Sequence, residues 1–292
     1  MRTIENIEID PIVHELFAQM KCRRIGRQHI RILLEHPDDV LAIEAAHQPE
    51  EPSDFIGGYR DNAAPELPEQ FTPANAQAFW QGVYDELGIK VTVPSVPKLT
   101  AEQVKSFDKF GFMLLYLPAI TEEQYPSSFV KPEWSRYFTV SSIERIPLKG
   151  AWVAVETIAK PHYDDAKGYP NDRLMATLKR TTRFNTSHDD LTGGLIPAIA
   201  KVTGFPKKKT RPPTAEEWNF IGNLFNWLRE HHRMSHLPDL GSTRSWEWCQ
   251  NAYESESRLV VGSSGGCGLA DVDAHLAGGR NDPVSFRVLA VL

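Results

Sequence analysis

Three histidines lie close together near the end of a segment with helical spacing. His231, His232 and His236 could bind a metal ion through their ring nitrogens, but no glutamate completes the i, i+4 pattern of zinc-protease helices. A helix C-terminus also favours cationic side chains, because its last carbonyl groups carry partial negative charge. We therefore interpret the three histidines as structural, and we predict no metal ligands and no cofactor.

Two other segments combine a histidine with paired aspartates. His162-Tyr-Asp-Asp165 and His188-Asp-Asp190 contain the residue types of a general acid and base, although Asp-rich turns and helix caps have the same composition. The sequence has no GxSxG nucleophile elbow and no strand–GxGxxG–helix segment. Since nothing assembles a nucleophile, a base and an orienting group, we predict no catalytic residues and a protein that is not an enzyme.

One basic segment and one glycine-rich segment could in principle contact phosphate. Lys207-Lys-Lys-Thr-Arg211 lies between prolines, and its basic composition fits a solvated loop as well as a phosphate site. Gly262–Gly268 lacks the GxxxxGK pattern of a phosphate loop. Cys22, Cys249 and Cys267 are too few for a disulfide framework and form no CxxC pair, which argues against a thiolate zinc site.

The composition is that of an ordinary folded protein. The chain has 292 residues, of which 41% are apolar and 24% are charged. Its 32 basic and 38 acidic residues give a net charge of −6, so we predict no nucleic-acid partner. The longest apolar run, residues 110–120, is about half of a bilayer span, and no signal peptide is visible at the start. We predict no membrane insertion and a cytoplasmic location, with display on a cell surface or virion left open.

The elements that must position these residues fall into two regions. Apolar residues recur at helical spacing in residues 1–48, and residues 48–73 are rich in proline, glycine and acidic residues, as in a linker. We expect another helix over 74–87 and a short strand within 88–98. Prolines then place a boundary near residue 95. The predicted domains are a mainly helical region, 1–95, and a second domain, 96–292.

The second domain is predicted to mix strands and helices. Continuous apolar runs and alternating patterns indicate the strands, and apolar residues at helical spacing indicate the helices. The predicted strands cover 110–118, 150–158, 258–262 and 285–292, and the predicted helices cover 171–179, 189–202 and 214–232. This mixture predicts an α+β fold class.

The helix after Thr214 has the strongest signals. Thr214 is a suitable N-cap, and Glu217 lies three residues later, which is the spacing of a capping box. Trp218, Ile221 and Phe225 follow at helical spacing and form one apolar face. We therefore predict that Thr214, Glu217 and Trp218 are structural residues.

Four segments of the second domain form an ordered set of motifs. They are Arg211-Pro-Pro-Thr-Ala-Glu-Glu-Trp218, Ser245-Trp-Glu-Trp-Cys-Gln-Asn251, Arg258-Leu-Val-Val-Gly-Ser-Ser264 and Ser285-Phe-Arg287. These segments resemble, in the same order, motifs of formylglycine-generating-enzyme-like proteins, which have a variant of the C-type lectin fold. The resemblance covers roughly residues 100–292 and implies that fold for the C-terminal two-thirds of the chain.

Three further features are the Trp-Glu-Trp block, the Gly-Gly-x-Gly-Leu-Ala segment at 265–270 and the chain end Phe286-Arg-Val-Leu-Ala-Val-Leu292. With these features the sequence looks most like, within that superfamily, the variable proteins diversified by diversity-generating retroelements. In those proteins, adenine-directed mutagenesis changes codons near the C-terminus, and the fold tolerates the changes on a ligand-binding surface. Mutagenesis of AAC or AAT codons cannot produce Trp, Glu, Gln, Lys or Met, which excludes Trp246, Glu247, Trp248 and Gln250 from variation. The implied variable region covers about 244–285, and we expect residues 273–285 to be exposed.

The resemblance thus separates two sets of residues in this sequence. The residues expected to bind ligand are Arg244, Tyr253, Ser255, Ser257, Asp273, Ala274, His275, Leu276, Asn281 and Asp282. The residues expected to form the scaffold are Thr214, Glu217, Trp218, Trp246, Trp248 and Phe286. The expected ligand is a protein of unknown identity, and the expected oligomeric state is a monomer.

Two alternatives remain open at this point. A formylglycine-generating enzyme needs a pair of active-site cysteines and a copper site, and the positions of Cys249 and Cys267 do not supply that arrangement. The calcium-binding motifs of sugar-binding lectins do not occur either. A non-catalytic binding protein is therefore the leading hypothesis. The alternatives are an enzyme of the sulfatase-modifying type and a structural component of a phage or surface assembly.

Overall fold

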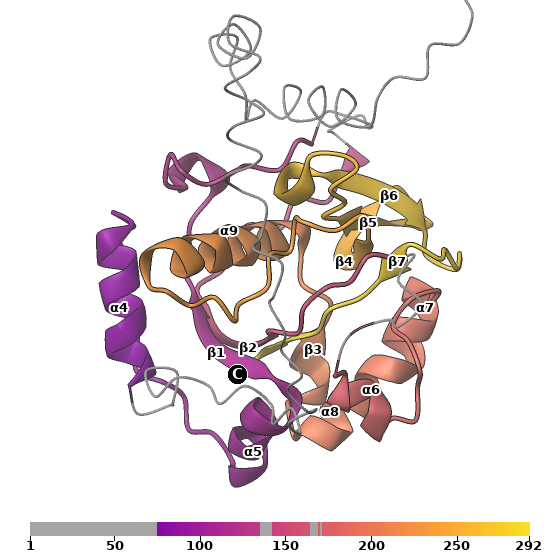
Figure 1. The fold of residues 1–292 in the computed structure, drawn as a ribbon, viewed down its shortest axis with the longest axis horizontal. Coiled ribbons are helices and arrows are strands. Elements are labelled where there is room, and N and C mark those ends of the chain that lie inside the picture. The colour runs from indigo at the N-terminus through magenta and orange to yellow at the C-terminus, as the bar shows by residue number, and fades with distance from the viewer. Residues whose placement is uncertain (1–74, 135–141, 164–168, 170) are drawn as a thin grey trace, which may run out of the picture. The chain divides into compact units, whose positions relative to one another are not determined.

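The computed structural model describes residues 75–134, 142–163, 169 and 171–292 (Figure 1). The chain divides into two units, Met1–Asn62 and Ala63–Leu292, and all of the described residues belong to the second unit. The helices and the linker predicted for residues 1–73 lie outside the described residues. Within the second unit the fold is α+β with two sheets, which confirms the predicted class.

The division of the chain lies about thirty residues before the predicted boundary near residue 95, because the helix α4 (Ala76–Glu86) packs against the core. The buried indole Nε1–H of Trp80 donates a 2.9 Å hydrogen bond to the carbonyl oxygen of Leu114. The segment after α4 was predicted to contain a strand, but residues 88–98 form none. A glutamine side chain of α4 binds the backbone of this segment instead, since Val93 N–H donates to Gln81 Oε1 over 2.9 Å.

The first sheet has four antiparallel strands in the order β1-β2-β8-β3. Its strands are β1 (Phe112–Leu117), β2 (Ala151–Glu156), β3 (Thr210–Arg211) and β8 (Leu289–Val291). The strands predicted at 110–118 and 150–158 are confirmed as β1 and β2. Every residue of β1 is buried, as a continuous apolar run requires. The helix α5 (Ala101–Phe110), which the sequence analysis did not predict, leads directly into β1.

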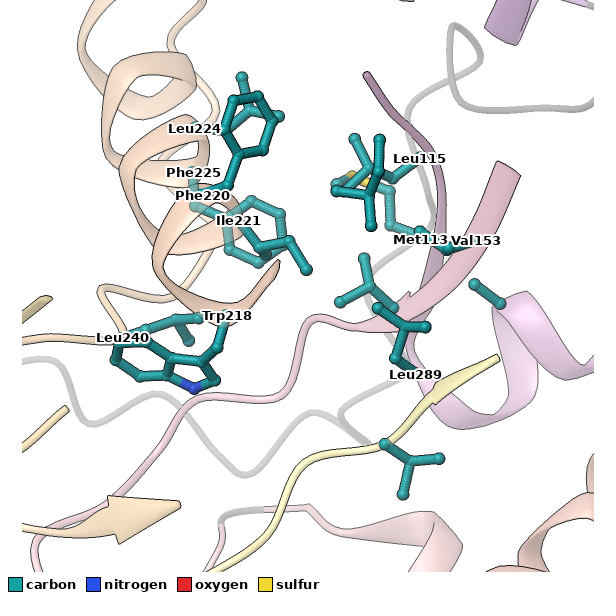
Figure 2. Packing of buried hydrophobic residues seen from close by; sticks show 14 of the residues in the cluster. Met113, Leu115, Val153, Trp218, Phe220, Ile221, Leu224, Phe225, Leu240 and Leu289 are labelled. Carbon is teal, nitrogen blue, oxygen red and sulfur yellow. The ribbon is translucent and has the colours of Figure 1, made fainter. Parts of the chain in front are cut away.

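The helix α9 (Ala215–His231) packs on this sheet and confirms the helix predicted from Thr214. Figure 2 shows Phe220, Ile221 and Leu224 of α9 pointing toward the apolar side chains of the sheet. The capping box is complete: Glu217 N–H donates to Thr214 Oγ1 over 3.1 Å, and Thr214 N–H donates to Glu217 Oε2 over 2.8 Å. Arg211 holds the same carboxylate by two hydrogen bonds of 2.6 and 2.7 Å.

Because Thr214 is buried in this capping box, we expect Thr214→Ala to lower the free energy of unfolding by about 1 kcal/mol. Thr214→Ser keeps the hydroxyl and should retain most of the stability. Urea unfolding of the two variants beside the parent measures the difference. Equal midpoints for the alanine variant and the parent would contradict a stabilising role for the cap.

The second sheet has the strand order β6-β5-β4-β7. Its strands are β4 (Trp246–Tyr253), β5 (Ser257–Val261), β6 (Val272–Leu276) and β7 (Val284–Ser285). The strand predicted at 258–262 is confirmed as β5. The strand β4 lies antiparallel to β5 and parallel to β7, and β6 lies antiparallel to β5 at the edge.

The segment predicted as one strand, 285–292, forms parts of two strands in different sheets. Its start lies in β7 and its end in β8, and Arg287 lies between them. The guanidinium of Arg287 donates to the carbonyl oxygens of Glu156 and Ile158 over 2.7 and 2.9 Å. This side chain turns inward to satisfy buried carbonyls, and the backbone therefore leaves one sheet and enters the other.

Short helices connect the two sheets. The helix predicted at 171–179 is shorter, since α6 covers Arg173–Thr177, and the helix predicted at 189–202 consists of three parts. These parts are α7 (His188–Asp190), the π-helical turn η4 (Leu191–Leu195) and α8 (Ile196–Thr203). Gly193 and Gly194 lie in the π turn. Other short helices among the described residues are η2 (Glu122–Gln124), η5 (Lys207–Lys209) and η6 (Gly268–Ala270).

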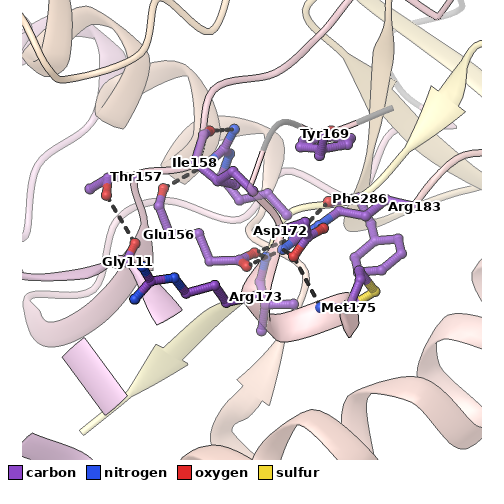
Figure 3. A network of polar contacts seen from close by, with 12 residues as sticks. Gly111, Glu156, Thr157, Ile158, Tyr169, Asp172, Arg173, Met175, Arg183 and Phe286 are labelled. Atoms are coloured by element: carbon purple, nitrogen blue, oxygen red, sulfur yellow. Dashed lines mark hydrogen bonds and ion pairs between the residues drawn. The ribbon is translucent and has the colours of Figure 1, made fainter. Parts of the chain in front are cut away.

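A buried ionic network lies between β2 and α6 (Figure 3). The Arg183 guanidinium donates to both oxygens of Glu156 over 2.7 and 2.8 Å, and to both oxygens of Asp172 over 2.6 and 3.0 Å. The side chains of Arg183 and Glu156 are only 1% and 0% exposed. Val288 N–H also donates to Glu156 Oε2 over 2.6 Å, and this bond connects the network to the last residues of the chain.

None of the helices in the described part of the chain has both the length and the apolar character needed to cross a bilayer.

Candidate ligand-binding face

The end of the β4–β5 hairpin carries three of the predicted ligand-binding residues in one cross-strand row. Tyr253 of β4 pairs with Ser257 of β5, and Ser257 pairs with Leu276 of β6. Paired positions on neighbouring strands project to the same face, so the three side chains form a row across the sheet. Leu276 is 61% exposed, and Tyr253 and Ser257 are half-buried. Ser255 is exposed in the turn that joins the two strands.

His275 belongs to a second row, on the opposite face of the sheet. It pairs with Arg258 of β5, and its ring lies edge-on to Trp248 of β4 with 6.3 Å between the ring centroids. Asp273 lies two residues earlier and therefore shares this face, whereas Ala274 and Leu276 lie on the other one. An edge strand thus presents predicted contact residues on both of its faces.

The backbone of β6 is partly satisfied along its outer edge. Ala274 N–H donates to the carboxylate of Asp273 over 2.7 Å, and Gly279 N–H donates to the carbonyl oxygen of Leu276 over 2.9 Å. Ala274 and Leu276 belong to the non-hydrogen-bonded pairs of the ladder with β5, because Ala277 N–H donates to the Glu256 carbonyl oxygen and bonded pairs alternate with non-bonded ones. Their backbone polar groups therefore point away from β5. These local bonds limit edge-to-edge pairing and leave side chains as the main contact groups.

The loop of residues 277–283 joins the two opposite edges of the second sheet, β6 and β7. Three strand spacings separate these edges, roughly 14 Å. The loop is fixed on α7, because Arg280 forms a 2.6 Å ion pair with Asp190 and Asp189 N–H donates to the Ala277 carbonyl oxygen. Asn281 and Asp282 therefore lie near β7, away from the hairpin end.

The structure brings six of the predicted ligand-binding residues together and places the other four elsewhere. The six at the hairpin end and along β6 are Tyr253, Ser255, Ser257, Ala274, His275 and Leu276. Asn281 and Asp282 lie toward the opposite edge. Arg244 precedes β4 and is therefore a strand length away from Tyr253; its backbone N–H donates to His162 Nδ1 over 3.2 Å. Asp273 lies near the start of the edge strand β6, opposite Val260 and away from the hairpin end.

Burial separates the predicted contact residues from the predicted scaffold residues. All ten predicted contact residues are exposed or half-buried. Thr214, Glu217, Trp218, Trp248 and Phe286 are buried, whereas Trp246 is half-buried at the start of β4. The expectation that residues 273–285 are exposed is wrong at Ala277, Val284 and Ser285. The last two are buried because β7 pairs with the interior of the sheet through β4.

A buried carboxylate supports the sheet from the side of α9. Glu247 of β4 accepts hydrogen bonds from Trp218 Nε1–H over 2.6 Å and from the Tyr169 hydroxyl over 2.9 Å, and it forms a 3.4 Å ion pair with Arg287. Burial alone would raise the pKa of Glu247, but Arg287 and Lys160 hold it below its ordinary value. The carboxylate therefore stays ionised and fixes β4 to α9 and to the chain end.

Lys160 completes this cluster. Its ammonium group donates to the carbonyl oxygens of Ser245 and Gly262 over 2.8 and 2.7 Å. Burial lowers the pKa of Lys160 to about 8, although Glu247 opposes the shift. The two carbonyls belong to the residue before β4 and the residue after β5, so Lys160 closes the base of the hairpin.

Four residues beside the predicted set were not identified as contact residues from the sequence. Arg258 and Arg280 lie next to His275 and the 277–283 loop, and Gln250 is exposed on β4. His188 was considered only as part of an acid–base pair, and its neighbour Trp248, with 5.8 Å between ring centroids, is distant in sequence.

The titratable groups near the sheet show which chemistry is available. Burial raises the pKa of the Cys249 thiol well above its ordinary value, so this thiol stays protonated and weakly nucleophilic. Burial lowers the pKa of His188 to about 4, so its ring is neutral at pH 7. Across residues 75–134, 142–163, 169 and 171–292, no group of three His, Cys, Asp or Glu side chains has the geometry to hold a metal ion.

Comparison of the sequence with protein-family models and with curated proteins, and of the chain with solved structures, gives no match.

Proposed function

We propose that this protein binds a ligand without catalysis and presents a variable surface on a C-type lectin scaffold, like the variable proteins of diversity-generating retroelements. One observation carries the proposal. The ten residues expected to bind ligand all lie at exposed or half-buried positions, while five of the six expected scaffold residues are buried. Variation limited to such positions leaves the core unchanged.

The backbone under the six-residue group is held rigidly. The ladder of β4, β5 and β6 fixes their register, and Glu247 and Lys160 attach the hairpin to the interior. Side chains at the hairpin end can therefore change without a change of backbone conformation. This arrangement supports a lectin-type scaffold with a replaceable contact surface, and the lectin fold itself is part of the proposal.

The chemistry of the surface favours a protein ligand. Tyr253 and His275 offer aromatic rings with polar groups, and Leu276 is an exposed large apolar residue. Aromatic and apolar anchors supply much of the contact energy at protein interfaces. Arg258 and Glu256 flank these anchors with charges of both signs, as at the polar rim of an interface.

A library randomised at His275, Leu276, Asn281 and Asp282 tests the proposed surface. Because these positions are exposed or half-buried, we expect most members to remain within about 0.5 kcal/mol of the parent in unfolding free energy. Members should differ in the proteins that they select from a display panel. Thermal unfolding of randomly chosen members and sequencing of the bound fraction measure both effects.

A matched library randomised at Val260, Phe286 and Leu289 provides the control. These residues are fully buried, so most members should fail to fold. If the two libraries lose folded members equally, the surface positions are packed and the proposal fails. An adenine-rich imperfect repeat of the final codons beside a reverse transcriptase gene would support diversification, and its absence would favour the enzymatic or structural alternative.

A further inference from the structure

A pocket of about 380 Å³ lies between the helical segment 188–203 and the loop that leads into β3. Ile196, Pro197 and Pro212 supply apolar lining. This volume is at the lower end of the range for small-molecule sites, and an apolar lining with a few polar groups is typical of them. None of the ten predicted contact residues lines the pocket.

The rim of the pocket is basic. Lys207 and Lys208 of η5 are exposed and line it. The loop that carries them has a fixed conformation, because Lys209 N–H and Thr210 N–H both donate to the Pro206 carbonyl oxygen, over 2.9 and 3.0 Å. Arg211 also lines the pocket, but its charge is neutralised by Glu217. The two lysines therefore give the rim its positive charge.

A buried histidine forms another part of the wall. His188 lines the pocket, is 6% exposed and packs edge-on against Trp248. Its Nε2 atom is buried and has no hydrogen-bond partner. An unsatisfied buried polar atom is costly, and such atoms are rare in folded proteins. A polar ligand group that reached this ring would remove that cost.

We propose that this pocket binds a small organic carboxylate with a compact apolar body. The apolar body would lie against Ile196, Pro197 and Pro212, and the carboxylate would lie toward the rim lysines. The Gln250 amide, exposed on β4 and part of the lining, offers a further donor. The His188 ring would pack against the inner end of this apolar body, and a polar substituent at that end would bond to the buried Nε2 atom.

This site is separate from the proposed variable surface. Trp248 contacts a residue of each, with 5.8 Å between its ring centroid and that of His188 and 6.3 Å to that of His275. Apart from Gln250, the lining residues lie outside the variable region that the resemblance implies. The codon argument excludes Gln250 itself from variation. The pocket would therefore keep one ligand chemistry while the surface changes.

Titration of the full chain with benzoate, benzamide and inorganic phosphate tests the site. We expect benzoate to bind more tightly than benzamide, which lacks the charge, and than phosphate, which lacks the apolar body. Lys207→Gln combined with Lys208→Gln should weaken benzoate binding about tenfold, since each exposed charge contact contributes modestly. Lys90→Gln combined with Lys105→Gln, at exposed lysines outside the pocket lining, should leave it unchanged.

A second measurement follows the histidine directly. With ¹⁵N-labelled histidine, benzoate should shift the ring resonances of His188, which a His188→Gln spectrum assigns. The same shift should be weaker in the rim variant at equal benzoate concentration. Equal binding of benzoate and benzamide, an unchanged affinity in the rim variant or a silent His188 ring would each overturn the proposal. Any of these results would leave the library experiment on the variable surface unaffected.

Discussion

Replacing Arg183 by methionine should lower the free energy of unfolding by about 3–5 kcal/mol, because it leaves two buried carboxylates without their counter-ion. Arg183 donates hydrogen bonds to both oxygens of Glu156 and to both oxygens of Asp172, and its side chain is 1% exposed. Methionine fills a similar volume but neutralises neither charge. For a unit of this size the loss corresponds to a fall in Tm of roughly 10 °C.

The matched control is Arg280→Met, which removes an exposed ion pair of similar length. Arg280 contacts Asp190 at 2.6 Å, but both side chains are largely exposed, so the expected loss is at most about 1 kcal/mol. Differential scanning calorimetry of both variants compares a buried and an exposed pair in one protein. A Tm for Arg183→Met close to that of Arg280→Met would show that the network does not stabilise the fold.

Trp218→Ala should have a comparable effect, about 3–5 kcal/mol, because a fully buried ring is replaced by a methyl group. The ring packs so closely on Gly262 that a Cβ atom at that glycine would overlap it, which leaves little space for the site to collapse. The substitution also removes the indole N–H that binds the buried carboxylate of Glu247. We expect the hairpin base to loosen together with the core.

Two further variants separate the packing of Trp218 from its hydrogen bond. Trp218→Phe keeps most of the apolar volume and loses only the donor, so it should cost less, about 1–3 kcal/mol. Trp246→Ala removes a half-buried ring at the start of β4. It should also cost less than Trp218→Ala, because folding removes less apolar area of the Trp246 ring from contact with water. Chemical denaturation should rank Trp218→Ala lowest, and any other ranking contradicts the assigned core position.

These two sites would give the proposed variable surface a stable support. Glu156 and Glu247 lie on different sheets, and Arg287 contacts both of them, through the Glu156 carbonyl oxygen and the Glu247 carboxylate. The last residues of the chain thereby connect the two sheets. Substitutions at the hairpin end act on side chains that do not take part in this connection, so the proposed binding function and the stability of the fold are separable.

Local patterns in the sequence determined the single elements well. The continuous apolar run gave β1, the alternating pattern gave β2, and the Thr214–Glu217 spacing gave the start of α9 with its reciprocal hydrogen bonds. Each of these signals depends on residues that are neighbours in the chain, so propensity and periodicity are sufficient. The α+β class follows from the same elements.

Only the tertiary structure decided how these elements meet. The sequence does not show that Trp80 binds the backbone of β1. The predicted domain boundary near residue 95 therefore separates α4 from the unit to which it belongs. The sequence also does not show that residues 285–292 divide between two sheets, because the inward turn of Arg287 depends on carbonyl groups 129 and 131 positions away.

The candidate site shows the same division between local and long-range information. The residues expected to bind ligand all lie outside the core. The codon argument concerns residue type alone, and it does not distinguish them from buried residues such as Val284 and Ser285. Which of them lie together depends on the register of β4, β5 and β6, which joins Tyr253, Ser257 and Leu276 and leaves Arg244 at the far end. Strand register is fixed by long-range pairing and burial, and these are properties of the folded chain.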